Sequence, residues 1–288
     1  MTVTEGPAAD TLPEAVTFQR YARRREWSNF ALLRHRARSG HLISMHQAGT
    51  HWLKFMVANA LARRHQIPPP RFNHANDIFP GHRDPVCYPQ IPHLLSGHSV
   101  PHPLICTRWA HRFFQLPPYV LLLRDLRDSL ASNYAKWKDR YAESFSTYLR
   151  GAPYAKRYNA DIWSTVRFLN AWSAVIARNP DRVLVVRYEI LQQQTAQTLS
   201  QVASHWDLQL EEQDIAHAVA SSSKTQMAAR DDPGRPAGAV RMDDPEPAFR
   251  YSPADLEYVA EVCARYLHNT FGYDYNDGVD TRCGDSSS

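Results

Sequence analysis

Short, unbroken apolar runs are the feature of this sequence that most restricts its fold. Four such runs occupy residues 42–45, 104–107, 119–123 and 183–187. Runs of this kind are typical of parallel strands buried on both faces, whereas strands with one wet face alternate apolar and polar residues. Helical segments follow most of the runs. We therefore predict an α/β fold in which helices flank a doubly wound parallel sheet.

The helical segments are recognised by the spacing of their apolar residues. From Leu53 to Leu61, apolar residues recur at i, i+3, i+4, i+7 and i+8, which places them on one face of a helix. Leu130 and Tyr134 mark a similar face after the third run. A last helix is predicted to begin at Ser252, whose hydroxyl can cap the first turn.

The chain has 288 residues, of which 43% are hydrophobic, and this suffices for a single large domain. Residues 1–14 and 276–288 are polar and aperiodic, so we predict that both ends are disordered and that residues 15–275 form the domain. Residues 67–103 are crowded with Pro and His and also lack a period. We expect them to form a long irregular insertion that shapes a pocket.

Charge and hydropathy exclude several classes of protein. The net charge of +4 is small and dispersed, which argues against nucleic acid as a partner. No apolar run approaches the roughly 18 residues that a membrane-spanning helix needs. We therefore predict no transmembrane segment and a cytoplasmic location, while the sequence leaves the oligomeric state open.

The segment that follows the first run has the composition of a phosphate-binding loop. It reads His-Gln-Ala-Gly-Thr-His-Trp over residues 46–52 and leads directly into the first predicted helix. Gly49 lets the backbone approach an anion, the free N–H groups at the helix start bind it, and Thr50 adds a donor. The Lys-Ser/Thr pair that kinases use to reach phosphate and magnesium is missing, which favours a metal-free ligand.

Two sequence blocks resemble the cytosolic-type sulfotransferases, which use 3'-phosphoadenosine 5'-phosphosulfate (PAPS). In that family the first strand leads into Pro-Lys-Ser-Gly-Thr-Thr-Trp, and Gly49, Thr50 and Trp52 match this pattern in register. The second block, residues 119–134, is similar to the family's strand followed by Arg-x-Pro-x-Asp, Ser and Tyr. The resemblance implies that the domain has the P-loop-like fold of a sulfotransferase and binds PAPS.

The resemblance also implies how the nucleotide is held. Arg124 and Ser132 would clasp its 3'-phosphate, since a forked cation and a hydroxyl suit the same anion. The block around Tyr188 and a weaker one around Met227 resemble segments that lie near the adenine. The implied donor-binding residues are Gln47, Ala48, Gly49, Thr50, His51, Trp52, Arg124, Ser132, Tyr188 and Met227, with Arg241 or Arg235 as a further phosphate ligand.

The catalytic residues of the family are not matched. Its loop lysine is replaced by Gln47, and its Lys-Thr-His at a strand end appears here as Cys-Thr-Arg, ending at Arg108. Arginine stays protonated, so Arg108 cannot be the general base. We hypothesise that His51 is the base and Arg108 the cation, with Gln47 donating a neutral hydrogen bond and His46 or His111 as alternative bases. A structural role for His51, as helix cap or phosphate ligand, is equally open.

The implied function is transfer of a sulfuryl group from PAPS to a hydroxyl of a small-molecule or lipid-like acceptor, with residues 67–103 shaping the acceptor pocket. One alternative is a PAPS-binding protein of the same fold that has lost turnover and acts as a sensor or scaffold. A nucleotide kinase is disfavoured by the missing Lys-Ser/Thr pair. Eleven of the 14 histidines lie between residues 35 and 111, but they repeat no known ligand spacing, so we predict no metal site.

Overall fold

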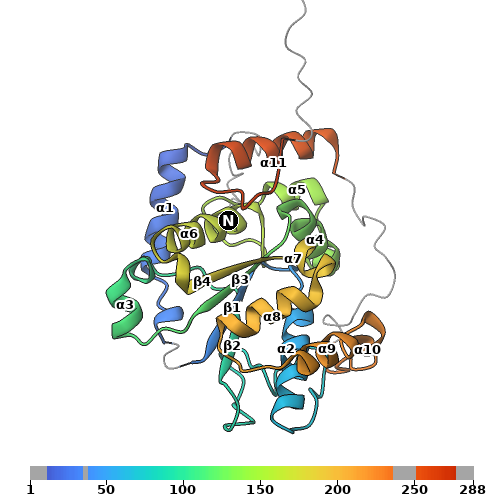
Figure 1. The fold of residues 1–288 in the computed structure, drawn as a ribbon. Helices are drawn as coiled ribbons and strands as arrows, with labels where there is room; N and C mark the ends of the chain where they lie inside the picture. Colours follow the sequence, from blue (N-terminus) through green and yellow to red (C-terminus); the bar gives the residue numbers. More distant parts are fainter. Residues whose placement is uncertain (1–11, 35–37, 236–250, 277–288) are drawn as a thin grey trace, which may run out of the picture.

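A parallel sheet forms the centre of the computed structural model, which describes residues 12–34, 38–235 and 251–276 (Figure 1). Within these ranges the sheet has four strands in the order β2-β1-β3-β4. Each neighbouring pair is parallel. The strands are β1 (Gly40–Ser44), β2 (Leu94–Gly97), β3 (Tyr119–Leu123) and β4 (Val183–Arg187). The predicted α/β class is therefore confirmed.

Three of the four predicted strands are confirmed, and the one at residues 104–107 is wrong. That run forms instead the 3-10 helix η2 (Pro103–Cys106), whose first turn is capped when Leu104 N donates to His102 Nδ1 at 3.1 Å. The missing strand is β2, which lies inside the segment predicted to be an irregular insertion and pairs with β1. With only four residues, two of them Ser and Gly, β2 is too short and too polar for its apolar pattern to show.

Helices cover both faces of the sheet, as a doubly wound fold requires. The Tyr119 ring packs against Trp172 of α6 with centroids 5.1 Å apart, while the Cβ side of Gly40 faces Trp206 at the end of α8. Because Tyr119 is paired with His41, and neighbouring strand residues point to opposite faces, α6 and α8 lie on opposite sides. Figure 1 shows α1, α6 and α11 above the sheet and α2, α8 and α9 below it. The helices are α1 (Ala15–Trp27), η1 (Leu32–Arg34), α2 (Thr50–Arg64), α3 (Arg108–Phe113), α4 (Leu126–Tyr141), α5 (Phe145–Arg150), α6 (Ile162–Arg178), η3 (Pro180–Arg182), α7 (Tyr188–Gln193), α8 (Thr195–His205), α9 (Glu212–Ala220), α10 (Lys224–Ala228) and α11 (Pro253–Tyr266).

The predicted helix signals are confirmed where the structure describes them. Leu53 and Leu61 of α2 are fully buried, as expected for the apolar face of a helix that packs on a sheet. Ser252 caps α11, and its side chain accepts a hydrogen bond from Asp255 N at 3.2 Å. None of the described helices is long and apolar enough to cross a membrane.

The predicted domain boundaries stay predictions. Residues 1–11 and 277–288, which make up most of the two ends predicted to be disordered, lie outside the described residues. Residues 12–14 are described, and the Tyr266 hydroxyl donates a hydrogen bond to the carbonyl of Pro13.

Parallel strands bring the segments that matter for function to one edge of the sheet. The phosphate-binding loop follows β1, His98 follows β2, Arg124 follows β3 and Tyr188 follows β4. In open α/β sheets, ligands bind outside these carboxyl ends. The candidate site is therefore expected where these four segments converge.

Candidate functional site

The loop after β1 turns the chain sharply into α2. Gln47 has a φ of 58° and Gly49 a φ of 88°, so two left-handed residues make the turn. Gly49 is the N-cap of α2, a helix of 15 residues whose first N–H groups have no partner within the helix. A helix start of this kind, at the edge where ligands bind, suits a phosphate or sulfate.

We expect Gly49→Ala to destabilise the protein. A Cβ at this position would lie 2.6 Å from Cδ2 of the Tyr188 ring, and the left-handed backbone alone costs an L-residue roughly 1–2 kcal/mol. Thermal unfolding should show a lower Tm. Gly97→Ala is a matched control, because a Cβ at Gly97 meets its nearest atom at an ordinary 3.7 Å. Equal Tm values for the two variants would contradict a packing role for Gly49.

Arg124 lies against both the loop and Ser132, as the second sequence block predicts. Its Nη1 donates to the Gln47 carbonyl at 3.2 Å and to Ser132 Oγ at 3.3 Å. The guanidinium carbon lies 4.9 Å from the centre of the Tyr188 ring. Asp128 Oδ2 is 3.5 Å from Nη2, a long contact on an exposed carboxylate. The two strand ends therefore converge on one place.

Arg124 also keeps an unused hydrogen-bond donor. Its Nε is buried and has no hydrogen-bond partner in the described part of the chain. A buried donor without a partner is costly, and an anion bound at the guanidinium would remove this cost. The residues present therefore fit a phosphate between Arg124 and Ser132.

Tyr188 and Met227, the residues predicted to lie near the adenine, border the same edge together with Trp52 of the loop. Trp52 Nε1 donates to the Ser222 carbonyl at 3.0 Å, and the Trp52 and Tyr188 rings meet edge to face with centroids 6.2 Å apart. Met227 is buried in α10, which begins two residues after Ser222. Two aromatic rings at right angles beside the loop can hold a flat base.

The further phosphate ligand is not located by the structure. Arg235 has a side chain that is 57% exposed, and its Nε lies 3.9 Å from Asp232 Oδ2. The structure gives Arg235 no contact with Arg124 or Ser132. Arg241 lies outside the described residues.

Arg108 and His111 are not brought to the loop. The ring of buried His111 bonds to the Ile105 carbonyl at 2.7 Å and packs edge to face on Tyr119, the first residue of β3. Tyr119 marks the amino end of the sheet, opposite the loop, and Arg108 is in the same six-residue helix as His111. The pairing of Arg108 with the strand-end Lys-Thr-His of the family was wrong, because residues 104–107 do not form a strand.

His98 is the functional candidate that sequence reasoning missed. It follows β2 directly, so β2 is the strand that leads into a histidine. Its Ser-Gly-His, and not the Cys-Thr-Arg that ends at Arg108, corresponds to the family's Lys-Thr-His at a strand end. His98 Nδ1 lies 2.8 Å from the Ser44 carbonyl and 3.2 Å from Ser44 Oγ. Ser44 Oγ is in turn 2.7 Å from Thr50 Oγ1 of the phosphate loop. Recognition of β2 as a strand would have pointed to His98.

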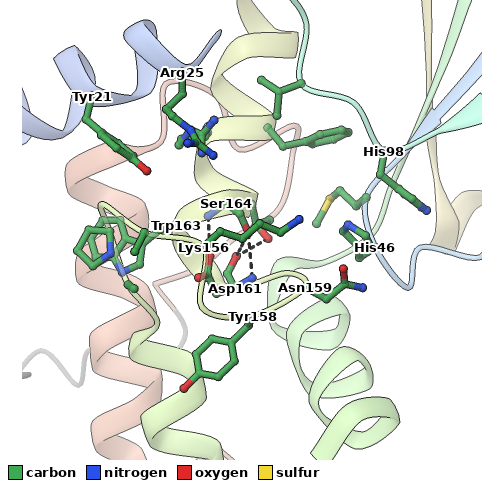
Figure 2. Close-up of a pocket in the computed structure, with 18 of the residues that line it drawn as sticks. Tyr21, Arg25, His46, His98, Lys156, Tyr158, Asn159, Asp161, Trp163 and Ser164 are labelled. Carbon is green, nitrogen blue, oxygen red and sulfur yellow. Dashed lines mark hydrogen bonds between the residues drawn. The ribbon is translucent and has the colours of Figure 1, made fainter. Parts of the chain in front are cut away.

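A cavity of about 190 Å³ opens beside the loop (Figure 2). Its lining comes from the ends of β1 and β2, from α1 and α6, and from the loop of residues 151–161. Of the predicted insertion 67–103, His98 and Val100 contribute. His46 and His98 stack on this wall with ring centroids 4.2 Å apart. The cavity therefore adjoins the loop through the histidine pair.

The protein interior holds the site histidines in their neutral form. Burial, followed by the charges of His98, Lys156 and Lys136, lowers the pKa of His46 to about 3. Burial also lowers the pKa of His98, and the Ser44 carbonyl only partly offsets this. A neutral imidazole can accept a proton.

His51 occupies a different place from the histidine pair. It lies in the first turn of α2 and does not line the cavity. Its side chain is exposed to solvent, yet desolvation by the surrounding protein, followed by the charge of Lys54, lowers its pKa. One turn further along α2, Lys54 is buried and donates a hydrogen bond to Asn76 Oδ1 at 2.6 Å. This bond links α2 to the segment that follows it. Lys54 was not singled out in the sequence.

Metal ligation has no support among the residues described. No three His, Cys, Asp or Glu side chains in these ranges are grouped as ligands. His93 contacts Arg38 at 3.5 Å, His98 bonds to Ser44, and His102 caps η2. The histidine-rich segment is thus spread over separate structural roles.

Comparison with known proteins agrees with the fold. A model of the sulfotransferase domain family matches residues 41–232, well over half of the 288-residue chain. Among solved structures, the chain is similar to mouse sulfotransferase SULT7A1 complexed with 3'-phosphoadenosine 5'-phosphate (PAP), with a TM-score of 0.56, 14% identity, and coverage of 84% of this chain and 89% of that chain. A structure of retinol dehydratase in a complex with retinol and PAP matches with a TM-score of 0.47 and 13% identity, over 78% and 73% of the two chains. No curated protein matches. The chain belongs to the sulfotransferase domain family.

Proposed function

We propose that this protein transfers a sulfuryl group from PAPS to a hydroxyl of a small-molecule or lipid-like acceptor. The observation that carries the proposal is the convergence of Arg124, Ser132 and the Gln47 carbonyl at one point. This convergence supports the binding of a nucleotide with two anionic groups, one held at the start of α2 and the other at Arg124. Membership of the sulfotransferase domain family and the PAP complex of the mouse relative agree with this assignment.

The geometry supports the following donor-binding roles. The N–H groups from Gly49 onward and the Thr50 hydroxyl would hold the phosphosulfate, because the start of α2 attracts anions. Arg124 and Ser132 would hold the 3'-phosphate, with the free Nε as an additional donor. When bound, PAPS supplies the activated sulfuryl group.

His98 is the general base that the geometry favours. Its Nδ1 is 2.8 Å from a carbonyl oxygen, which can only accept, so Nδ1 carries the hydrogen. This tautomer leaves a lone pair on Nε2, and Nε2 has no hydrogen-bond partner among the described residues. His98 lines the cavity and is held in its neutral form. It can therefore accept the proton of an acceptor hydroxyl placed in the cavity.

Positive charge near the reacting end would come from lysines outside the loop. Gln47 supplies none, and Arg108 lies at the other end of the sheet. Lys156 lines the cavity, and the charges of Lys156 and Lys136 both act on His46. Cations here would stabilise negative charge as it develops on the leaving phosphate.

Thermal unfolding with nucleotides tests the proposal. We expect PAP to raise the Tm, because a ligand that binds only the folded state stabilises it by mass action. Adenosine 5'-phosphate, which lacks the 3'-phosphate, should give a smaller shift, and ATP with magnesium should give little. A larger shift with ATP and magnesium than with PAP would contradict the proposal and favour a kinase.

Product formation separates the enzyme from the alternative of a sensor or scaffold. PAP binding without sulfuryl transfer to any member of a broad panel of hydroxyl compounds would support the binding protein. The retained histidine at the end of β2 argues for turnover. A cytoplasmic location stays a prediction.

A further inference from the structure

The cavity carries positive charge that its own residues do not balance. Arg25 of α1, Arg167 of α6 and Lys156 line it. None of these three side chains has a hydrogen bond or an ion pair with another residue in the described ranges. Surface cations can remain solvated, but three on the wall of one cavity indicate an anionic ligand.

Arg25 and Arg167 lie close enough to repel each other. Burial is the main reason why the pKa of Arg167 is lowered. Glu26 and Tyr21 act against this, and the charge of Arg25 lowers the pKa further. The Nε of Arg167 is buried and has no hydrogen-bond partner among the described residues, while its guanidinium lies 5.8 Å from the Tyr21 ring. Two neighbouring guanidinium groups with an unused donor form a site that a carboxylate, phosphate or sulfate would complete.

Neither acidic group nearby forms an ion pair with Arg25 or Arg167 in the described part of the chain. Asp161 caps α6, where its Oδ1 accepts a hydrogen bond from Ser164 N at 2.8 Å, so its carboxylate interacts with the start of the helix. Glu26 acts on Arg167 electrostatically but forms no ion pair with it within the described residues. Burial is the main reason why the pKa of Glu26 is raised, and the charges of Arg167 and Arg23 partly offset this. Three cations thus line the cavity against one carboxylate, Asp161.

The cations and the proposed base lie on different sides of the cavity. Figure 2 shows Arg25 extending from α1 on one side, His46 and His98 on the opposite side, and Lys156 between them. A ligand that spans the cavity can therefore place one group at the arginines and another at the histidine pair. Tyr21, Trp163 and Phe168 add aromatic surface to the cavity wall.

We propose that the acceptor is a hydroxyl compound that also bears a carboxylate, phosphate or sulfate, which Arg25 and Arg167 bind while the hydroxyl lies at His98. The proposal rests on the proposed function for the role of His98, but the anion site stands on the arginines alone. It narrows the acceptor from hydroxyl compounds in general to anionic ones. An uncharged lipid alcohol would leave both guanidinium groups unpaired.

Matched pairs of ligands test this anion site. The first pair is 4-hydroxyphenylacetate and 4-hydroxyphenylacetamide, and the second is glycerol 3-phosphate and glycerol, so that carboxylate and phosphate are distinguished. Calorimetric titration is carried out with and without saturating PAP. We expect at least one anion to bind about 10-fold or more tightly than its neutral partner, with a Kd that rises with salt.

Variants show whether the arginines are responsible. Arg25→Met and Arg167→Met should each remove most of the preference for the anion, and Arg167→Lys should restore part of it. Arg24→Met on the same helix is the control, because Arg24 is exposed and does not line the cavity. Arg25 is exposed, so its replacement leaves the core intact even if Arg167→Met fails to fold.

The outcomes separate this inference from the proposed function. Equal binding within both pairs, binding of no anion, or an undiminished preference in Arg25→Met would overturn the anion site. Failure of the wild-type protein to bind PAP would count against the proposed function instead. Because the titrations are also run without PAP, the anion site is tested in either case.

Discussion

Replacing Arg124 with Met is expected to weaken PAP binding by about 100-fold or more. Truncation of one partner in a buried charge pair costs about 2–5 kcal/mol, and Arg124 is the one described side chain that joins the loop, Ser132 and a free buried donor. Adenosine 5'-phosphate lacks the group that Arg124 is proposed to hold, so its affinity should change much less. Calorimetric titration of both nucleotides measures the difference.

The comparison of two nucleotides separates phosphate binding from support of the loop. Arg124 also donates to the Gln47 carbonyl, so a purely structural role would weaken both nucleotides equally. Ser132→Ala should weaken PAP by about 10-fold, as expected for one hydrogen bond to a charged group. Arg140→Met is the control, since Arg140 lies exposed at the far end of α4 and contacts only Trp137 among the described residues. An unchanged preference for PAP over adenosine 5'-phosphate in Arg124→Met would refute the assignment.

The parts of the site that sequence predicted are those encoded within one short segment. The loop from Gln47 to Thr50 needs only a buried strand, a glycine and a helix start, all of which are adjacent in the chain. Arg124 and Ser132 are eight residues apart, so one strand end and the first turns of one helix bring them together. Local spacing was therefore sufficient for both.

The error over Arg108 came from the choice of strand. Residues 104–107 are as apolar as a strand, but Pro103 and the capping ring of His102 stabilise a 3-10 helix there. The edge strand β2 has β1 as its one neighbouring strand in the described sheet, and its four residues carry no apolar pattern long enough to recognise. Because the family histidine is located by the strand that it follows, the wrong strand led to the wrong residue.

The cavity could not be predicted, because it is a product of tertiary packing. Arg25, His98, Lys156 and Arg167 come from four separate segments of the chain. The sequence assigned the acceptor pocket to residues 67–103, yet most of the lining belongs to α1, α6 and the loop between α5 and α6. Only the folded chain shows that these segments meet beside the phosphate loop.

Replacing His98 with Asn is expected to reduce sulfuryl transfer to an alkyl hydroxyl by about 10²–10⁴-fold, the usual contribution of a general base. The Asn side chain can still donate to the Ser44 carbonyl, so the variant removes the base and keeps the local structure. PAP binding should be unchanged. A nitrophenol acceptor ionises without help near neutral pH, so its transfer rate should fall much less than that of the alkyl hydroxyl.

The pH profile of the wild-type protein gives an independent measure of the same group. His98 is flanked by His46, and burial, with the charges of Lys54 and Lys136, lowers its pKa below the ordinary histidine value of about 6.5. The base works only when neutral. We therefore expect kcat/KM to stay constant through neutral pH and to decrease only where the pH falls to the lowered pKa of His98. His46→Asn and His51→Asn are the matched controls. A loss in His51→Asn as large as in His98→Asn, with the same dependence on the acceptor, would assign the proton transfer to the phosphate loop instead.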